Sequence, residues 1–190
     1  GHAVGLGKRK FAIIAQDAAF GQRLLAHATS RLDDFGLQPE AVRIITDAEE
    51  NDENILKQAI REFSRYQPPA PDALPVESPF DAVIFAGDPA FALRTAPLLA
   101  YYDVGPDRAL FLGNALWNQD QLLSEPSLQG GVFAIRPSQF DTKFNANWQA
   151  IWREAPGELS RLGFDALALV TALSVTDDNQ SLSPAGKWAQ

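Results

Sequence analysis

Three short loops combine residues that could bind a small polar ligand. They read QDAAFG from residue 16, GDPAF from residue 87 and GNALWN from residue 113. Each loop precedes an expected helix, whose first backbone amides are free to donate hydrogen bonds. Asp17, Asp88, Asn114 and Asn118 add short polar side chains. The three loops are therefore a candidate wall of a binding site.

The same residues also have structural interpretations. Asp17 and Asp88 each stand where a carboxylate caps a helix, and on sequence alone capping is the favoured role of both. The indole of Trp117 could stack on a ligand or be buried against a neighbouring helix, and the sequence favours neither alternative.

The sequence lacks the residues that most enzyme mechanisms need. It has no cysteine and two histidines: His2 lies in a GH pair typical of an expression-tag remnant, and His27 lies within a helical pattern. No G-x-G-x-x-G follows the first expected strand, and neither a Walker A loop nor a G-x-S-x-G elbow is present. We therefore predict a protein that is not an enzyme, with no catalytic residue, no metal and no cofactor.

Composition limits the partners. The chain has 190 residues, 46% of them hydrophobic, and a formal net charge of -8. This length suffices for one sizeable core, and the negative charge would repel a polyanion. We expect a soluble globular domain that binds no nucleic acid.

The pattern of apolar residues predicts strands and helices in alternation, and these elements would position the three loops. Helices are expected over residues 20–36, 54–63 and 88–103, and Pro97 predicts a kink or an early end of the last. The acidic run 47–53 is expected to form a solvated first helical turn. Apolar runs typical of buried parallel strands occupy residues 10–15, 41–46, 80–87, 109–113 and 130–135. The alternation predicts an α/β fold with a doubly wound, mostly parallel five-stranded sheet. In such sheets ligands bind at the carboxyl ends of the strands, where the three loops lie.

Five motifs in order resemble the second half of one protein family. KFAIIAQDAAFGQRLLAHATSRLDDFG, FDAVIFAGDPAFALRTAPLLAYYDV, ALFLGNALWN, LQGGVFAIRP and RLGFDALALVTAL are similar to type I periplasmic solute-binding proteins of the leucine/isoleucine/valine-binding kind. The likeness covers roughly residues 8 to 175 and is greatest to penicillin-binding protein activators.

The resemblance implies how the chain is organised. It implies two α/β lobes that close on a small ligand. Residues 8–137 would form the second lobe, with strand order 2-1-3-4-5, and 138–175 would be helices that pack on the absent first lobe. We expect residues 1–7 and 176–190 to be tails.

The resemblance also implies a site, a location and two candidate functions. Ligand contacts would come from Ala18 to Phe20, Asp88 and Pro89, and Asn114 to Asn118. No acidic residue of GNALWN matches the one that binds an ammonium group in amino-acid binders, which argues against an amino-acid ligand. The location would be the periplasm, with an outer-membrane lipoprotein as the full-length form. The alternative function is a module that binds a cell-wall synthesis protein and no small molecule.

The last expectation concerns the C-terminal helices. Phe144, Trp148, Ile151 and Trp152 form one apolar stripe, and Phe164, Leu167 and Val170 form a second. Without a first lobe these stripes need a cover, and a self-complementary patch favours a two-fold homodimer. The alternative is that the segment folds back on its own lobe.

Overall fold

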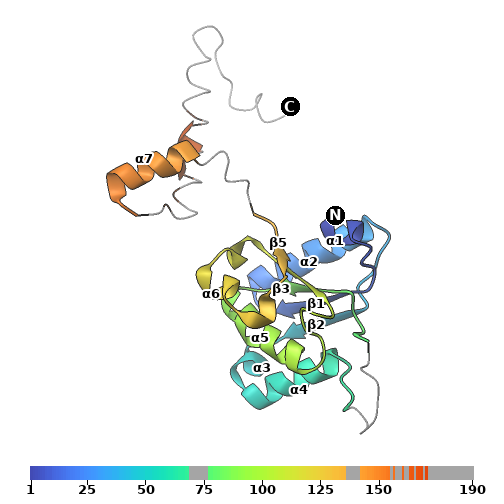
Figure 1. Cartoon of the computed structure of the whole chain (residues 1–190). Coiled ribbons are helices and arrows are strands. Elements are labelled where there is room, and N and C mark those ends of the chain that lie inside the picture. Colours follow the sequence, from blue (N-terminus) through green and yellow to red (C-terminus); the bar gives the residue numbers. More distant parts are fainter. Residues whose placement is uncertain are drawn as a thin grey trace. The chain divides into compact units, whose positions relative to one another are not determined.

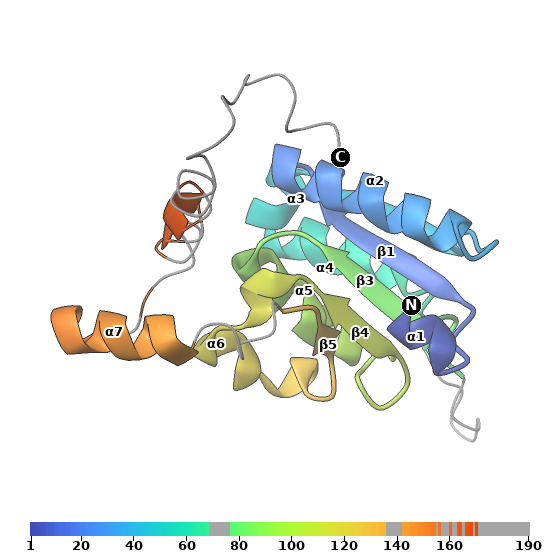
Figure 2. The ribbon, with the colours of Figure 1, turned by 90° about the horizontal axis from the view of Figure 1, so that it is seen from above.

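The strands form one parallel sheet, described by a computed structural model. The structure describes residues 1–68, 77–135, 142–154 and part of 156–170. The strands are β1 (Phe11–Gln16), β2 (Ala41–Ile45), β3 (Ala82–Ala86), β4 (Leu110–Gly113) and β5 (Val132–Phe133). Their order is β2-β1-β3-β4-β5 and every pair is parallel, which confirms the predicted topology. Figure 2 shows β1, β3, β4 and β5 side by side in this order.

Helices cover both faces of this sheet (Figure 1). The α-helices are α1 (His2–Gly5), α2 (Ala19–Asp33), α3 (Asp47–Asn51), α4 (Glu53–Phe63), α5 (Pro89–Tyr101), α6 (Asp120–Leu123) and α7 (Thr142–Trp152). Two 3-10 turns, η1 (Ala115–Trp117) and η2 (Pro126–Leu128), lie between β4 and β5. The chain divides into two compact units, Gly1–Arg136 and Pro137–Gln190.

The side chains of the strands alternate between two hydrophobic cores in the first unit, one on each face of the sheet. Ala12 and Ile14 of β1 belong to the core beneath α4 and α5, whereas Phe11, Ile13 and Ala15 belong to the core beneath α1 and α2. Successive strand side chains point to opposite faces, so a strand buried on both faces reads as one apolar run. This is why KFAIIA was recognisable as a central strand.

Two local expectations need correction. Residues 1–7 were expected to be a tail, but residues 2–5 form helix α1, and Ala3 is buried in the core on the α2 side of the sheet. Pro97 was expected to kink α5 or to end it early, and the early end is wrong, because α5 continues to Tyr101 with its apolar face, including Ala96 and Leu99, buried in the core. The Pro-rich stretch 67–79 is expected from the sequence to be a surface loop, and its residues 69–76 lie outside the described residues, as does the expected tail 176–190.

The acidic run after β2 forms two helix starts. Thr46 and Glu49 make a reciprocal capping box at the start of α3, and Asp52 caps α4. The hydrogen bond from the Thr46 backbone amide is the main cause that lowers the pKa of the Glu49 carboxyl. The acidic run lies at helix starts, as predicted, but it is not solvated throughout, because Glu49 and Glu50 are partly buried.

In the second unit, aromatic rings hold two segments together. The Phe144 ring lies 5.6 Å from that of Trp148 and 4.7 Å from that of Phe164. Phe144 is buried, but Ile151 and Trp152 are exposed. The apolar stripe of α7 is therefore only partly covered within its own unit.

Candidate functional site

The structure brings the three predicted loops to one edge of the sheet. Asp17 and Ala18 follow β1, Asp88 and Pro89 follow β3, and Asn114 follows β4. These strands are parallel neighbours, so their carboxyl ends share an edge. Phe20 and Pro89 are partly buried and Asn118 is exposed.

Gln16, the last residue of β1, links two of these loops. Its side-chain Nε2 donates to Oε2 of Glu50 over 3.1 Å and to Oδ2 of Asp88 over 3.3 Å. Its Oε1 accepts from the backbone N–H of Asp88 over 3.3 Å. One amide therefore holds α3 and the start of α5 to the end of the central strand.

Glu50 is an enclosed carboxylate of this network. Its side chain is 9% exposed, and the Arg94 guanidinium lies 3.6 Å from its Oε1. The same guanidinium donates to the Glu50 backbone oxygen over 3.3 Å. A desolvated carboxylate needs such partners. Gln16 and Glu50 are not among the site residues predicted from the sequence, although a polar residue that ends an apolar strand is a usable signal for Gln16.

Asp88 and Asn114 are occupied by internal hydrogen bonds. Oδ1 of Asp88 accepts from the Phe91 backbone amide over 2.8 Å, so the capping role of Asp88 is confirmed. Asn114 donates from Nδ2 to the Gly87 oxygen over 2.8 Å and accepts from the Leu116 amide over 2.9 Å. These two side chains join the ends of β3 and β4 and position the loops.

The favoured capping role of Asp17 is wrong. The N-cap of α2 is Ala18, with extended backbone angles, because the chain turns one residue later than expected. The Asp17 backbone amide bonds to the Ile45 oxygen, and its Oδ1 accepts from Nε2 of Gln22 over 2.8 Å. Its carboxylate is exposed at the rim of the edge.

Trp117 adopts the buried alternative. It is 3% exposed, and its ring lies 5.3 Å from the ring of Phe85 in the core. A Cβ at Gly113 would meet this indole at 2.0 Å, so Gly113 leaves the space that the ring fills. The indole Nε1 is buried without a partner in the described part of the chain. In this arrangement the indole has no open face on which a ligand could stack.

One helix that starts at this edge has no side chain that caps its first amides. Of the helices that directly follow β1, β3 and β4, only α2 lacks a side-chain cap, because alanine occupies its N-cap. The first amides of a helix have no partner within the helix, and they carry the positive end of its dipole. The β1–α2 loop therefore combines free donors with the exposed Asp17 carboxylate and the partly buried Phe20.

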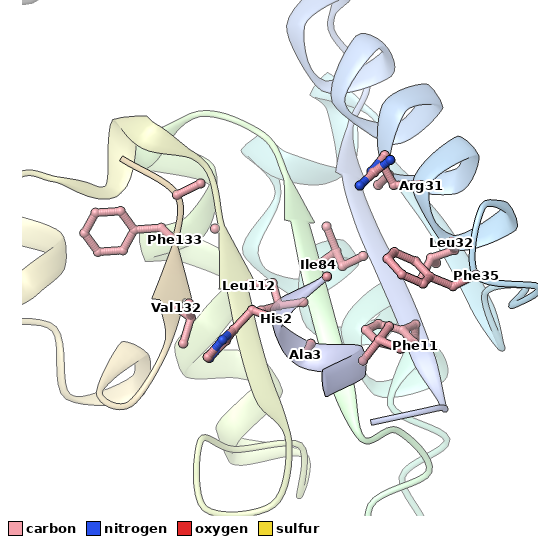
Figure 3. Close-up of a pocket in the computed structure, with 15 residues that line it drawn as sticks. His2, Ala3, Phe11, Arg31, Leu32, Phe35, Ile84, Leu112, Val132 and Phe133 are labelled. Atoms are coloured by element: carbon pink, nitrogen blue, oxygen red, sulfur yellow. The ribbon is translucent and has the colours of Figure 1, made fainter. Parts of the chain in front are cut away.

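A separate apolar pocket lies on the α2 side of the sheet (Figure 3). Its volume is about 420 Å³, and its lining includes Phe11, Leu32, Ile84, Leu112 and Val132. None of the eight predicted site residues lines this pocket. Helix α1 forms one wall, which explains how Ala3 becomes buried.

Among the described residues, no group of three or more His, Cys, Asp or Glu side chains is placed to hold a metal ion. No described helix has both the length and the apolar character needed to cross a membrane.

Comparison with solved structures identifies the fold. A protein assigned to branched-chain amino acid ABC transport in Rhodospirillum rubrum aligns with 89% of this chain at 12% identity and a TM-score of 0.67. A solute-binding protein of an ABC transporter from Rhodopseudomonas palustris BisB5, solved with 3,4-dihydroxybenzoic acid, aligns with 89% at 18% identity and 0.56. An extracellular ligand-binding receptor from Verminephrobacter eiseniae aligns with 82% at 18% identity and 0.55.

The chain has the fold of type I periplasmic binding proteins. It spans 45%, 44% and 42% of the three solved chains, which is less than half of each. No protein-family model matches the sequence, and neither does any curated protein. The similarity to these proteins is therefore one of fold and strand order. The candidate site is inferred from the residues of this chain alone.

Proposed function

We propose that this chain is one lobe of an extracytoplasmic solute-binding protein, located in the periplasm, that binds a small polar molecule without a chemical step. The fold supports this function, because doubly wound sheets bind ligands at the carboxyl edge. The solved relatives include a solute-binding protein in complex with 3,4-dihydroxybenzoic acid.

The open start of α2 is the observation that carries the proposal. Asp88 and Asn114 close the neighbouring loops with their own caps, but Ala18 leaves the first amides of α2 without a side-chain acceptor. A ligand oxygen would accept from these amides, and a ligand hydroxyl or N–H would donate to Asp17. We therefore place the ligand on Asp17, Ala18 and Phe20. Pro89, Trp117 and Asn118 would support the surrounding loops.

A self-capping variant tests this assignment. Ala18→Asp would place a carboxylate at the N-cap, where it accepts from the same amides that the ligand needs. We expect the variant to be more stable by about 1 kcal/mol and to lose ligand binding. Ala26→Asp, an exposed change farther along α2, adds the same charge without a cap and is the control.

Binding is best measured by chemical shifts of the ¹⁵N-labelled chain, which report weak complexes. Hydroxybenzoates, sugars and amino acids are the probes. Saturable shifts at residues 17–21 that disappear in Ala18→Asp and persist in Ala26→Asp support the proposal. If Ala18→Asp still binds a probe, the ligand does not bind at the start of α2.

A second function is favoured because several polar side chains at the carboxyl edge already form hydrogen bonds within the protein. Gln16, Asp88 and Asn114 have protein partners for their side chains. Such an edge suits a module that binds another protein, here a cell-wall synthesis protein. Absence of shifts with every probe would favour this alternative.

A further inference from the structure

All three tyrosines of the protein lie together on one surface. The rings of Tyr66 and Tyr102 are 5.3 Å apart, and those of Tyr101 and Tyr102 are 5.0 Å apart. Tyr101 is 75% exposed, and the other two are partly buried. A tyrosine presents an apolar ring together with a polar hydroxyl, and this combination is common where proteins bind ligands or partners.

Tyr66 and Tyr102 border a groove that we call the tyrosine groove. It has a main cavity of about 670 Å³ and a smaller one of about 190 Å³. The two cavities share Arg65, Tyr66, Gln67 and Tyr102. The rest of the main cavity is lined by Asn54, Lys57, Gln58, Arg61 and Glu62.

The tyrosine groove lies along the exposed face of α4, and none of the residues that line it belongs to the candidate ligand site. It runs from Asn54 in the first turn of α4 to Tyr66 beyond the end of α4 at Phe63, where Tyr102 follows the end of α5 at Tyr101. The groove is thus a second site, and its assignment does not rest on the proposed function.

Two strained residues stand in the smaller cavity. Arg65 has a φ of 53° and Asp103 a φ of 65°, the left-handed conformation that follows a helix end. Glycine is usual there, and another residue type costs roughly 1 kcal/mol or more. Arg65 and Asp103 place side chains in the cavity where glycine would leave none. Strain of this kind is concentrated at functional sites.

Charges around the groove are largely balanced. Lys57 pairs with Glu53, and Gln58 donates to Glu62 over 2.9 Å. The Arg65 guanidinium donates to the Glu40 oxygen over 3.0 Å and lies 5.5 Å above the Phe80 ring. Among the described residues, the ion pairs include none for Arg61, so its fork of donors remains for a ligand. The balance favours a neutral polar ligand over an ionic one.

We propose that the tyrosine groove binds a neutral oligosaccharide. Sugar hydroxyls both donate and accept, and the amides of Asn54, Gln58 and Gln67 can do both in return, while Arg61 donates. The weakly positive C–H faces of a sugar ring suit the negative face of a tyrosine ring. The open main cavity suits a chain of several sugar units.

The test uses the full 190-residue chain and saturation-transfer NMR with maltotetraose, cellotetraose and chitotetraose. At least one probe should bind saturably at millimolar concentration or below. Tyr66→Ala and Arg61→Gln should each weaken that binding by about fivefold, the effect of about 1 kcal/mol. Arg23→Gln, an exposed arginine on α2, should leave the binding unchanged.

Two results would overturn the proposal: no saturation transfer from any of the probes, or binding that Tyr66→Ala and Arg61→Gln leave intact. If circular dichroism shows that Tyr66→Ala does not fold, the surface variant Arg61→Gln decides alone. Ala18→Asp separates the two sites, because it should abolish binding at the carboxyl edge and leave oligosaccharide binding unchanged.

Discussion

At the scale of single residues, Gln16 determines the geometry of the carboxyl edge. Both hydrogens of its side-chain amide are used by carboxylates, one on Glu50 and one on Asp88. Glu50 is 9% exposed, so water cannot readily replace the lost donor. Removing a partner from a buried charged group is more costly than removing one at the surface.

We expect Gln16→Leu to lower the free energy of unfolding by about 2 to 3 kcal/mol, measured by urea denaturation. Gln38→Leu is the matched control, because Gln38 also donates to a carboxylate, that of Asp33, but on the surface. That control should change stability by less than about 0.5 kcal/mol. Equal losses of stability in the two variants would mean that the Gln16 hydrogen bonds contribute no more than a hydrogen bond at the surface.

A second residue-scale prediction concerns Asp81 and pH. Burial acts to raise the pKa of Asp81, but hydrogen bonds from the backbone amides of Lys10 and Arg9, each 2.8 Å long, outweigh it and lower the pKa. The ordinary value, about 3.9, applies to the unfolded chain. The stabilisation is therefore complete above that value and is lost as the pH falls through the lower folded pKa.

Asp81→Asn should cost about 1 to 2 kcal/mol at pH 7, and the difference from the unmodified chain should shrink as the pH falls below about 4. Urea unfolding at a series of pH values measures this difference. Glu40→Gln, at an exposed carboxylate, is the control. A difference that is independent of pH would show that the Asp81 charge has no part in stability.

At the scale of elements, helix α2 must approach the sheet closely, and Gly21 allows it. A Cβ at position 21 would lie 2.2 Å from the Gln16 oxygen and 2.8 Å from the Ala86 oxygen. Both obstacles are backbone atoms at the ends of β1 and β3, which cannot rotate away. A larger residue would therefore displace the start of α2, where the ligand is proposed to bind.

Gly21→Ala should destabilise the chain by about 1 to 3 kcal/mol in thermal or urea unfolding, and it should weaken ligand binding at residues 17–21. Gly5→Ala is the control, because no atom lies within 4 Å of its Cβ position. Alanine at position 5 should be neutral or slightly stabilising, as expected in a helix. A neutral Gly21→Ala would mean that α2 can shift without cost.

The sequence predicted the elements better than it predicted the site. The strand KFAIIA was visible because burial on both faces of a sheet gives one continuous apolar run, and the amphipathic α4 because burial of one face gives a period of 3.6. The capping role favoured for Asp17 was wrong, because a shift of one residue moves the helix start, and the role of Trp117 was left open, because the orientation of its ring decides between stacking and burial. The partners of Gln16 were out of reach, since Glu50 and Asp88 lie 34 and 72 residues away.

At the scale of the whole molecule, the C-terminal unit leaves large apolar side chains uncovered. Ile151 is 71% exposed and Trp152 is 61% exposed, and Phe164, Leu167 and Val170 are also exposed. Such a concentration on a short segment is unusual for a protein surface without a partner. Burying an exposed side chain of this kind contributes about 1.5 to 3 kcal/mol. A few of them would suffice to hold two copies together.

We therefore predict a two-fold homodimer formed through the exposed apolar side chains of this unit, because in a two-fold dimer the same patch on each copy pairs with itself. Sedimentation equilibrium should give a dimer, and Trp152→Lys should shift it to the monomer. Leu123→Lys, at an apolar residue 49% exposed on the first unit, should leave the dimer intact. Iodide quenching of tryptophan fluorescence separates the remaining cases. A monomer in which iodide quenches Trp148 and Trp152 would contradict the idea that this apolar surface must be buried. A monomer with both shielded would instead indicate that the segment packs on its own chain.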